Sequence, residues 1–270
     1  MFKDEVTAVG NAAKGKINLL EHNFTGYIMM SLLAGLYIAL GSILMGIVGG
    51  VFTGGGSYAT KLACGIVFSV GLCFVTMGGA ELFTGNNLVM TIGGLKKTVT
   101  WGQVAKLWIV CWLGNLVGSV IAAVIFTMTG IPGSGDIGAF FANTAAAKMG
   151  GSAANLFSKA ILCNICVCVA IWCGTKLKSE GAKIAMNFCC VTTFVTCGFE
   201  HSIANMTFLS IGLMNQNGVA GITMGGFLYN LLIVTLGNMV GGILFVAIPY
   251  YLIAKAEDRK STRLNSSHSK

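Results

Sequence analysis

Two stretches decide the fold of this chain, GGAELFTGNN at residues 78–87 and CGFEHSIAN at residues 197–205. In each, a turn of small residues leads into the spacing Glu-x4-Asn, and each interrupts an apolar segment. Polar side chains are costly at membrane depth, and a broken helix is tolerated there only where it is buried in protein or lines a cavity. Two such interruptions at corresponding places predict a transport site near the middle of the bilayer.

The composition is that of a membrane protein. The 270 residues are 55% hydrophobic and 10% charged, with a mean hydropathy of +0.79, whereas soluble domains are about 25% charged. A membrane-spanning helix needs about 20 apolar residues. Six runs approach or exceed that length, at residues 27–52, 62–80, 107–128, 153–175, 184–214 and 225–254. We therefore predict an all-α membrane protein with six transmembrane helices, of which the second and fifth are broken.

The predicted domain organisation is one channel domain with two short flanks. Residues 1–26 are polar and are interpreted as a cytoplasmic or interfacial helix, residues 27–254 as the six-span channel domain, and residues 255–270 as a cytoplasmic tail. The last ten residues, STRLNSSHSK, do not continue the preceding span, and we interpret them as a remnant of cloning or sequencing without a function.

The net charge of +8 follows the positive-inside rule. With the N-terminus inside, most Lys and Arg residues outside the last ten positions fall on the inner side, and the outer side has only Lys61, Lys148 and Lys159. This distribution predicts a multi-pass protein of the plasma membrane, the inner membrane of a bacterium, with both termini in the cytoplasm. A nucleic-acid partner is not predicted, because the charges lie at the ends of spans and not on one basic face.

Glycine spacing indicates an internal duplication. Gly114-x3-Gly118 lies in the third apolar run and Gly237-x3-Gly241 in the sixth. Small residues at this spacing let membrane helices approach closely. With the repeated Glu-x4-Asn spacing, they predict two three-helix repeats, and because three is an odd number the second repeat must be inverted in the membrane.

The interruptions also hold the ionisable residues predicted at membrane depth, Glu81, Glu200 and His201. Such residues are functional candidates, and histidine, with an unperturbed pKa of about 6.5, changes charge in the physiological range. The two glutamates either line a cation path or, as the repeated spacing favours, cap the helices that restart after them, with Asn86.

Free backbone N–H groups at two opposed helix starts would form a neutral site that attracts a small anion. Thr84, Asn86 and Asn205 would add neutral hydrogen-bond donors. Bulky apolar residues bracket the site and are predicted to form constrictions that exclude hydrated ions. These constriction residues are Phe68, Leu72, Leu82, Phe83 and Phe194.

No enzyme, metal or cofactor function is predicted. All ten cysteines lie in apolar runs, and the pair Cys163 and Cys166 lacks the further ligands of a zinc site, so we interpret the cysteines as packing residues. Glu200-His201 reverses the order of the metalloprotease motif H-E-x-x-H, and the sequence has no P-loop or dinucleotide fingerprint.

Four strings resemble the formate/nitrite transporter family: GGAELFTGNN, KAILCNICVCVAIW, GFEHSIANM and the loop NTAAAK at residues 143–148. The resemblance covers about residues 5–255. It implies an aquaporin-like six-helix protomer in a homopentamer, with one pore in each subunit. The overall likeness is greatest to the hydrosulfide-channel branch of the family.

Site residues follow from the resemblance position by position. It implies that Thr84 and His201 form the central site, that Asn164 and Asn205 lie nearby, and that Lys148 supplies positive potential from the loop between spans three and four. It places Phe68, Leu72, Leu82 and Phe194 in two constrictions.

The predicted function is a channel for small monovalent weak-acid anions, with hydrosulfide ranked first and formate and nitrite next. One alternative is proton-coupled transport of formate or nitrite. A second is an aquaporin-type pore for neutral solutes, although the Asn-Pro-Ala strings of aquaporins are absent and the two prolines, Pro132 and Pro249, lie outside both interruptions.

Overall fold

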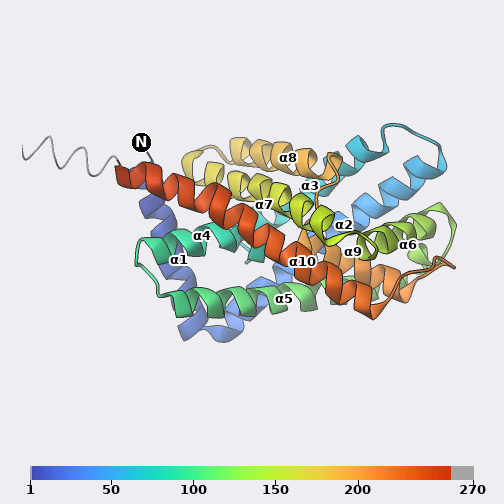
Figure 1. Cartoon of the computed structure of the whole chain (residues 1–270), viewed down its shortest axis with the longest axis horizontal. Coiled ribbons are helices and arrows are strands. Elements are labelled where there is room, and N and C mark those ends of the chain that lie inside the picture. The colour runs from blue at the N-terminus through green and yellow to red at the C-terminus, as the bar shows by residue number, and fades with distance from the viewer. Residues whose placement is uncertain (1, 257–270) are drawn as a thin grey trace, which may run out of the picture.

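The computed structural model describes residues 2–256, which form an elongated bundle of helices (Figure 1). Five helices in this part of the chain are long and apolar enough to cross a membrane, which confirms a multi-pass architecture. They are α2 (Phe24–Gly54), α3 (Thr60–Gly78), α5 (Trp101–Met128), α7 (Ala153–Lys176) and a last helix, Met224–Ala256, that contains α10 (Met224–Gly242) and a π-helical turn (Ile243–Ala247).

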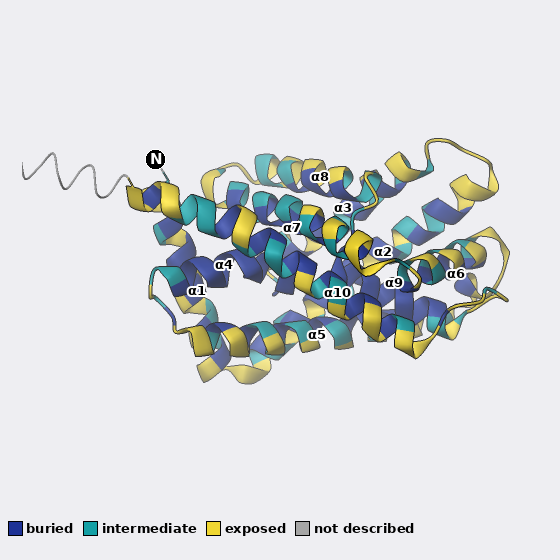
Figure 2. Ribbon diagram, in the orientation of Figure 1, coloured by how far each residue is buried: buried dark blue, intermediate teal, exposed yellow. Residues whose placement is uncertain are grey.

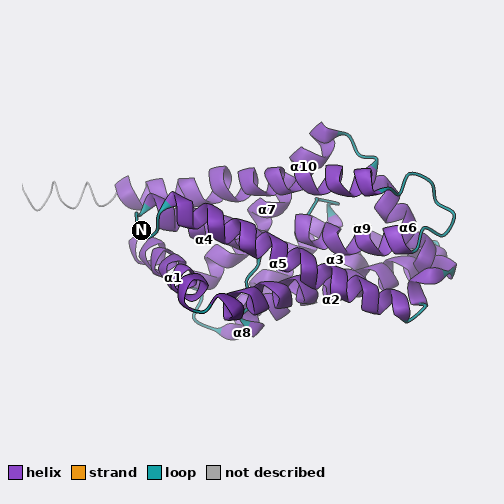
Figure 3. Ribbon diagram, turned by 90° about the horizontal axis from the view of Figure 1, so that it is seen from below, coloured by secondary structure: helices purple, strands orange, loops and turns teal. Residues whose placement is uncertain are grey.

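The shorter helices lie at the two ends of the bundle. At one end α1 (Lys3–His22) packs beside α4 (Phe83–Leu95), and at the other α6 (Gly135–Met149) packs beside α9 (Ser202–Met214) (Figures 1 and 3). Helix α8 (Glu180–Thr196) runs beside α3, and a 3-10 turn (Ile131–Gly133) precedes α6. The N-terminus and Ala256 lie at the same end of the molecule (Figure 1).

Both predicted interruptions fall between helices. Helix α3 ends at Gly78, the next residue, Gly79, has φ of 72°, and the chain is non-helical until α4 begins. Gly198, with φ of 71°, is the corresponding left-handed residue between α8 and α9. Only glycine adopts this left-handed conformation without strain. In both places an N–H bonds back to the carbonyl five residues earlier, Ala80 to Val75 and Phe199 to Phe194, each at 2.9 Å.

The helices after the interruptions are buried on all sides. Every residue of α4 from Phe83 to Gly94 is buried, as is every residue of α9 from Ser202 to Gly212 (Figure 2). In contrast, the outward faces of α5 and α10 expose large apolar side chains such as Ile109 and Leu232. Exposed apolar side chains on long helices suit contact with lipid or with another subunit, and the polar residues of α4 and α9 are enclosed by protein.

The two glycine pairs make matched close contacts. A Cβ built on Gly118 would overlap the Leu32 carbonyl of α2, and one built on Gly241 would overlap the Ile161 carbonyl of α7. Glycine at these positions therefore allows α5 to pack against α2, and α10 against α7, at backbone distance.

One segment differs from its prediction. Residues 143–148 were expected in a loop, but they lie inside helix α6, with Lys148 in its last turn. Alanine is the strongest helix former, and a cation near a helix C-terminus is favourable. Phe141 packs onto Gly46 of α2 and Ala145 onto Gly212 of α9, so the small residues of this segment serve close packing.

The predicted flanks have different outcomes. Helix α1 is a separate helix with one buried face, formed by Val6, Val9, Ala13, Ile17 and Leu20, as expected of an amphipathic interfacial helix. The tail interpreted as a cloning remnant lies outside the described residues.

Candidate functional site

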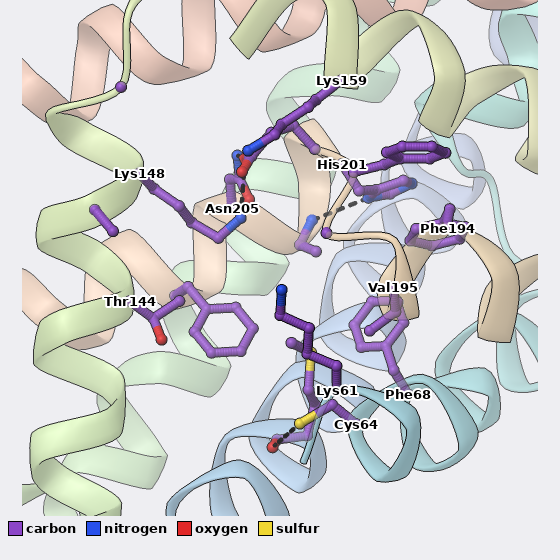
Figure 4. A pocket seen from close by; sticks show the side chains of 18 of the residues that line it. Lys61, Cys64, Phe68, Thr144, Lys148, Lys159, Phe194, Val195, His201 and Asn205 are labelled. Carbon is purple, nitrogen blue, oxygen red and sulfur yellow. Dashed lines mark hydrogen bonds and ion pairs between the residues drawn. The ribbon is translucent and has the colours of Figure 1, made fainter. Parts of the chain in front are cut away.

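A cavity of about 550 Å³ opens at the α6–α9 end of the bundle (Figure 4). Its lining comes from α2, α3, α6, α7, α8 and α9 and includes Lys61, Lys148 and Lys159, so we call it the lysine-lined cavity. Phe68, Phe194 and His201 also form part of its wall. The cavity therefore connects three cations to the histidine at the second interruption.

His201 is held in one orientation and one neutral form. Its Nδ1 accepts a hydrogen bond from the Ala204 N–H at 3.1 Å, which caps the start of α9. Its Nε2 lies 3.0 Å from Thr84 Oγ1, at the start of α4. Since Nδ1 is an acceptor, the ring hydrogen of the neutral form lies on Nε2, which donates to the Thr84 hydroxyl. His201 and Thr84, predicted to form one site, are therefore in direct contact.

An aromatic constriction stands beside the histidine. The rings of Phe68 and Phe194 meet edge to face with centroids 6.0 Å apart, and Phe194 stacks on His201 with centroids 5.9 Å apart. Leu72 and Leu82 are buried in the same apolar core as the two phenylalanines but do not line the lysine-lined cavity. Phe194 thus packs directly on His201, and Phe68 packs on Phe194.

Phe83, predicted to be a constriction residue, does not line the lysine-lined cavity. Its side chain lines a different, apolar cavity between α5 and α10, where it lies with Trp108, Trp112 and Leu231. Leu82 and Phe83 are consecutive at the start of a helix, where neighbouring side chains point in different directions. Phe83 is buried at the wall of that cavity, and Leu82 is not part of its lining.

Glu200 belongs to a buried polar network at the cavity wall. Its Oε2 accepts hydrogen bonds from Lys148 Nζ at 2.9 Å and from Asn205 Nδ2 at 2.6 Å. Asn205 also donates to Asn230 Oδ1, and Asn230 donates to the Lys148 carbonyl, at 2.8 Å each. The opposite charges of Lys148 and Glu200 partly offset each other at a distance.

Glu81 lies in a corresponding network at the other end. It pairs with Lys16 of α1, and its Oε2 accepts from Asn86 Nδ2 at 2.9 Å. Asn86 also contacts Cys111 Sγ at 3.4 Å. Each interruption therefore has one lysine, one glutamate and one asparagine five residues after the glutamate.

The capping role predicted for Glu81, Glu200 and Asn86 is wrong. The residue at the start of α4 is Leu82, and the Phe83 N–H donates to Asn115 Oδ1 at 2.9 Å. At the start of α9, the Ser202 N–H donates to Asn238 Oδ1 at 2.9 Å, and His201 is the cap. The carboxylates are bound to ammonium groups instead, because a buried carboxylate is stabilised most by a partner of opposite charge.

Asn115 and Asn238 were not singled out in the sequence, although they hold both interruptions together. Asn115 Nδ2 donates to the carbonyls of Ser31 and Glu81 at 2.7 and 2.9 Å. Asn238 Nδ2 donates to those of Ala160 and Glu200 at 2.8 and 2.9 Å. The signal was present inside the glycine pairs, which read GNLVG at residues 114–118 and GNMVG at residues 237–241.

Asn164 lies behind Thr84 and not in the cavity lining. Its Nδ2 contacts the Thr84 carbonyl, Asn87 Oδ1 and the Asn238 carbonyl at 3.3, 2.9 and 2.7 Å. It is fully buried and links α4, α7 and α10. Within residues 2–256, no group of three metal-ligating side chains comes together, and the ten cysteines are free thiols.

The fold is that of a multi-pass membrane protein built from long apolar helices. The chain belongs to the formate/nitrite transporter family, whose model, described as "Formate/nitrite transporter", matches residues 3–252. This is a family of transporters and channels and not of enzymes, as predicted.

The chain is similar to named relatives over most of its length. It is 34% identical to the nitrite transporter NirC of Salmonella typhimurium, over 98% of this chain and 97% of NirC. It is 30% identical to the formate channel FocA of Escherichia coli, over 85% and 86% of the two chains.

Two solved structures have the same fold. One, described as "FNT family ion channel", superposes with a TM-score of 0.87 at 32% identity and covers 93% of this chain and 98% of its own. The other, described as "Pentameric formate channel with formate bound", superposes with a TM-score of 0.73 at 28% identity and covers 85% and 96%.

Proposed function

We propose that this protein is a channel for small monovalent weak-acid anions, assembled as a homopentamer with one path through each subunit. The observation that carries this proposal is the 3.0 Å contact between His201 and Thr84, at the starts of two helices and at the wall of the lysine-lined cavity. Similarity to the nitrite transporter NirC and the formate channel FocA supports the anion class, and similarity to a pentameric formate channel supports the pentamer.

The proposed membrane arrangement has six spans in two inverted repeats, with α3–α4 and α8–α9 as the broken second and fifth. The matched contacts of Asn115 and Asn238 support the repeat. Both termini are placed in the cytoplasm of the cell that carries the protein in its plasma membrane, and the positive-inside distribution of Lys and Arg supports this orientation.

In the proposed mechanism, an anion enters the lysine-lined cavity and loses water at Phe68 and Phe194. It exchanges that water for hydrogen bonds from His201 Nε2–H and the Thr84 hydroxyl, and Asn205 and Asn164 hold the two helix starts in place around it. Neither donor is a fixed cation, and Lys148 is engaged by Glu200. The anion is therefore held weakly enough to leave, as conduction requires, through a second constriction at Leu72 and Leu82.

A weak-acid anion also has a proton-linked route. His201 takes up a proton from water, passes one from Nε2 to the anion and returns to its neutral form, so that the neutral acid crosses the apolar constriction without the cost of burying a charge. Uptake requires Nδ1 to give up the hydrogen bond from Ala204. We propose that His201 controls permeation in this way.

The proposed order of substrates is hydrosulfide first, then formate and nitrite. Hydrosulfide is small, weakly hydrated for an anion, and takes up a proton in the range where histidine titrates. Formate and nitrite are anions of stronger acids and need more help from the protein to become neutral. Chloride is expected to pass less well, because it cannot be neutralised by a proton.

The test is a flux panel in proteoliposomes at fixed pH with hydrosulfide, formate, nitrite, chloride, glycerol and water. The proposal expects the three weak-acid anions to pass and glycerol to be excluded. Formate transport without hydrosulfide transport would overturn the ranking. Uptake of formate or nitrite that stops when the proton gradient is collapsed would favour the proton-coupled alternative, and glycerol flux without anion flux would favour the aquaporin-type pore.

A further inference from the structure

Lys148 is a weaker long-range source of attraction for anions in the lysine-lined cavity than an unpaired cation would be. Its ammonium group is 2.9 Å from Glu200 Oε2, and the side chains of the two residues are only 16% and 8% exposed. A paired charge has a short-range field, because the opposite charge cancels most of it at a distance. A cation without such a partner would attract anions over a longer distance.

Lys61 is such a cation. It lies in the first turn of α3 and lines the cavity, and no carboxylate pairs with it among residues 2–256. Figure 4 shows its side chain extending into the cavity, with the ammonium group between Lys148 and Phe194. An anion that approaches the aromatic constriction from this cavity therefore passes Lys61.

Helix stability does not explain this lysine. The N-terminal end of a helix has a partial positive charge, so a cation in the first turn of α3 is unfavourable for the helix. A lysine that only anchors the protein at the membrane surface would extend outwards to the lipid headgroups, whereas Lys61 extends into the cavity.

The balance of charge in the cavity lining also favours Lys61 as a residue that attracts anions. Glu200 is the one carboxylate in the described lining, against Lys61, Lys148 and Lys159. Lys159 is half-buried, and its carbonyl accepts the Glu200 N–H at 3.4 Å, which places its backbone beside the existing ion pair. Lys61 comes from a different helix and lies apart from that pair.

We propose that Lys61 is the residue that concentrates permeant anions at this mouth of the channel, whereas Lys148 holds Glu200 in place. This inference rests on the proposed anion-channel function. An unpaired cation inside a concave, low-dielectric mouth raises the local concentration of anions and the rate at which they enter. Lys61 is thus a specificity residue that contacts the anion as it enters the cavity and not at the central site.

The experiment compares Lys61→Ala, Lys61→Arg and Lys159→Ala in proteoliposomes, with formate and hydrosulfide as the probes. Initial flux is measured over a series of substrate concentrations at ionic strengths of about 20 and about 300 mM, which bracket weak and strong screening. Gradients in both directions are used, so that the orientation of the protein in the vesicle does not affect the result. Each variant is first checked for assembly by size-exclusion chromatography.

Lys61→Ala is expected to raise the half-saturating concentration about threefold or more at low ionic strength, with the maximal flux unchanged. The difference should largely disappear at high ionic strength because salt screens the charge. Lys61→Arg should match the wild type, and Lys159→Ala should have a smaller effect than Lys61→Ala.

Two results would overturn the role of Lys61. One is an unchanged half-saturating concentration in Lys61→Ala at low ionic strength, with normal wild-type flux. The other is an equal effect of Lys159→Ala, which would assign the attraction to the total charge of the mouth. Wild-type vesicles that pass neither formate nor hydrosulfide would instead overturn the proposed function itself, and the role of Lys61 with it.

Discussion

The α1–α4 end and the α6–α9 end of the molecule are built from the same parts, but only one has a titratable group at its helix start. Both have a lysine paired with a glutamate, and both have an asparagine that binds the first N–H of the restarting helix. The residue directly after the glutamate is Leu82 at the α1–α4 end and His201 at the α6–α9 end. The two ends thus share their framework contacts, and the histidine is present at the α6–α9 end alone.

This difference separates residues that build the interruptions from residues that act in them. Asn115 and Asn238 satisfy backbone groups, as does the Nδ1 of His201. The Nε2 of His201 points instead at Thr84, which comes from the other copy. The proposed site therefore depends on two half-helices from different halves of the chain, and variants at matched positions can test how far the two ends are equivalent.

The largest effect is expected when either asparagine is removed. Asn115→Ala and Asn238→Ala should each destabilise the protein by about 1–3 kcal/mol, because each leaves the buried first N–H of the restarting helix without its acceptor. Thermal unfolding in detergent measures the change. Ser119→Ala is the control, because Ser119 makes a single hydrogen bond, to the Gly35 carbonyl at 3.3 Å. A large effect at one asparagine and none at the other would show that the two ends are not built alike.

The next effect is expected at the histidine. His201→Asn keeps an oxygen that can accept the Ala204 N–H, since asparagine is a good helix cap, but it removes the Nε2–H that points at Thr84. Anion flux should fall about tenfold and its pH dependence should change, because the variant has no imidazole that can carry a proton. Proteoliposome flux against pH is the measurement. An assembled variant with the flux and pH profile of the wild type would remove His201 from the mechanism.

A smaller effect is expected at the ion pair. Lys148→Ala leaves Glu200 as an unpaired carboxylate at the cavity wall, and its charge should repel the anion and lower the flux several-fold, more than Lys159→Ala does. The double variant Lys148→Ala/Glu200→Gln should recover much of the flux, because no uncompensated charge remains. If Lys148→Ala and Lys159→Ala have equal effects and the double variant gives no recovery, both lysines act only as anchors at the membrane surface.

The smallest effect is expected at Phe83. Because it faces the cavity between α5 and α10, Phe83→Leu should leave flux and selectivity within about twofold of the wild type. Phe194→Leu, beside His201, should instead admit larger anions such as acetate. The measurement is the permeability to acetate relative to formate in the Phe83→Leu and Phe194→Leu variants. A loss of selectivity in Phe83→Leu would return this residue to the constriction.

Local sequence was sufficient to locate the interruptions, because Gly79 and Gly198 adopt a conformation that other residues avoid. The Thr84–His201 contact was anticipated through family resemblance, although the two residues are 117 positions apart. The capping prediction failed because the partners of Glu81 and Glu200 are lysines on other helices, 65 and 52 residues away. Helix α6 was missed because its alanines and glycines were interpreted as loop residues, although their small size serves packing against α2 and α9.

The short length of α4 and α9 has a consequence for synthesis of the chain. Each has 13 residues and is about 20 Å long, too short to cross a hydrocarbon layer of about 30 Å. Each is fixed by an asparagine that the ribosome makes later, Asn115 on α5 for α4 and Asn238 on α10 for α9. A nascent chain that stops before either asparagine therefore has a half-helix whose first N–H group still lacks its partner. The contacts of α4 can be completed only after α5 has been inserted, and those of α9 only after α10 has been inserted.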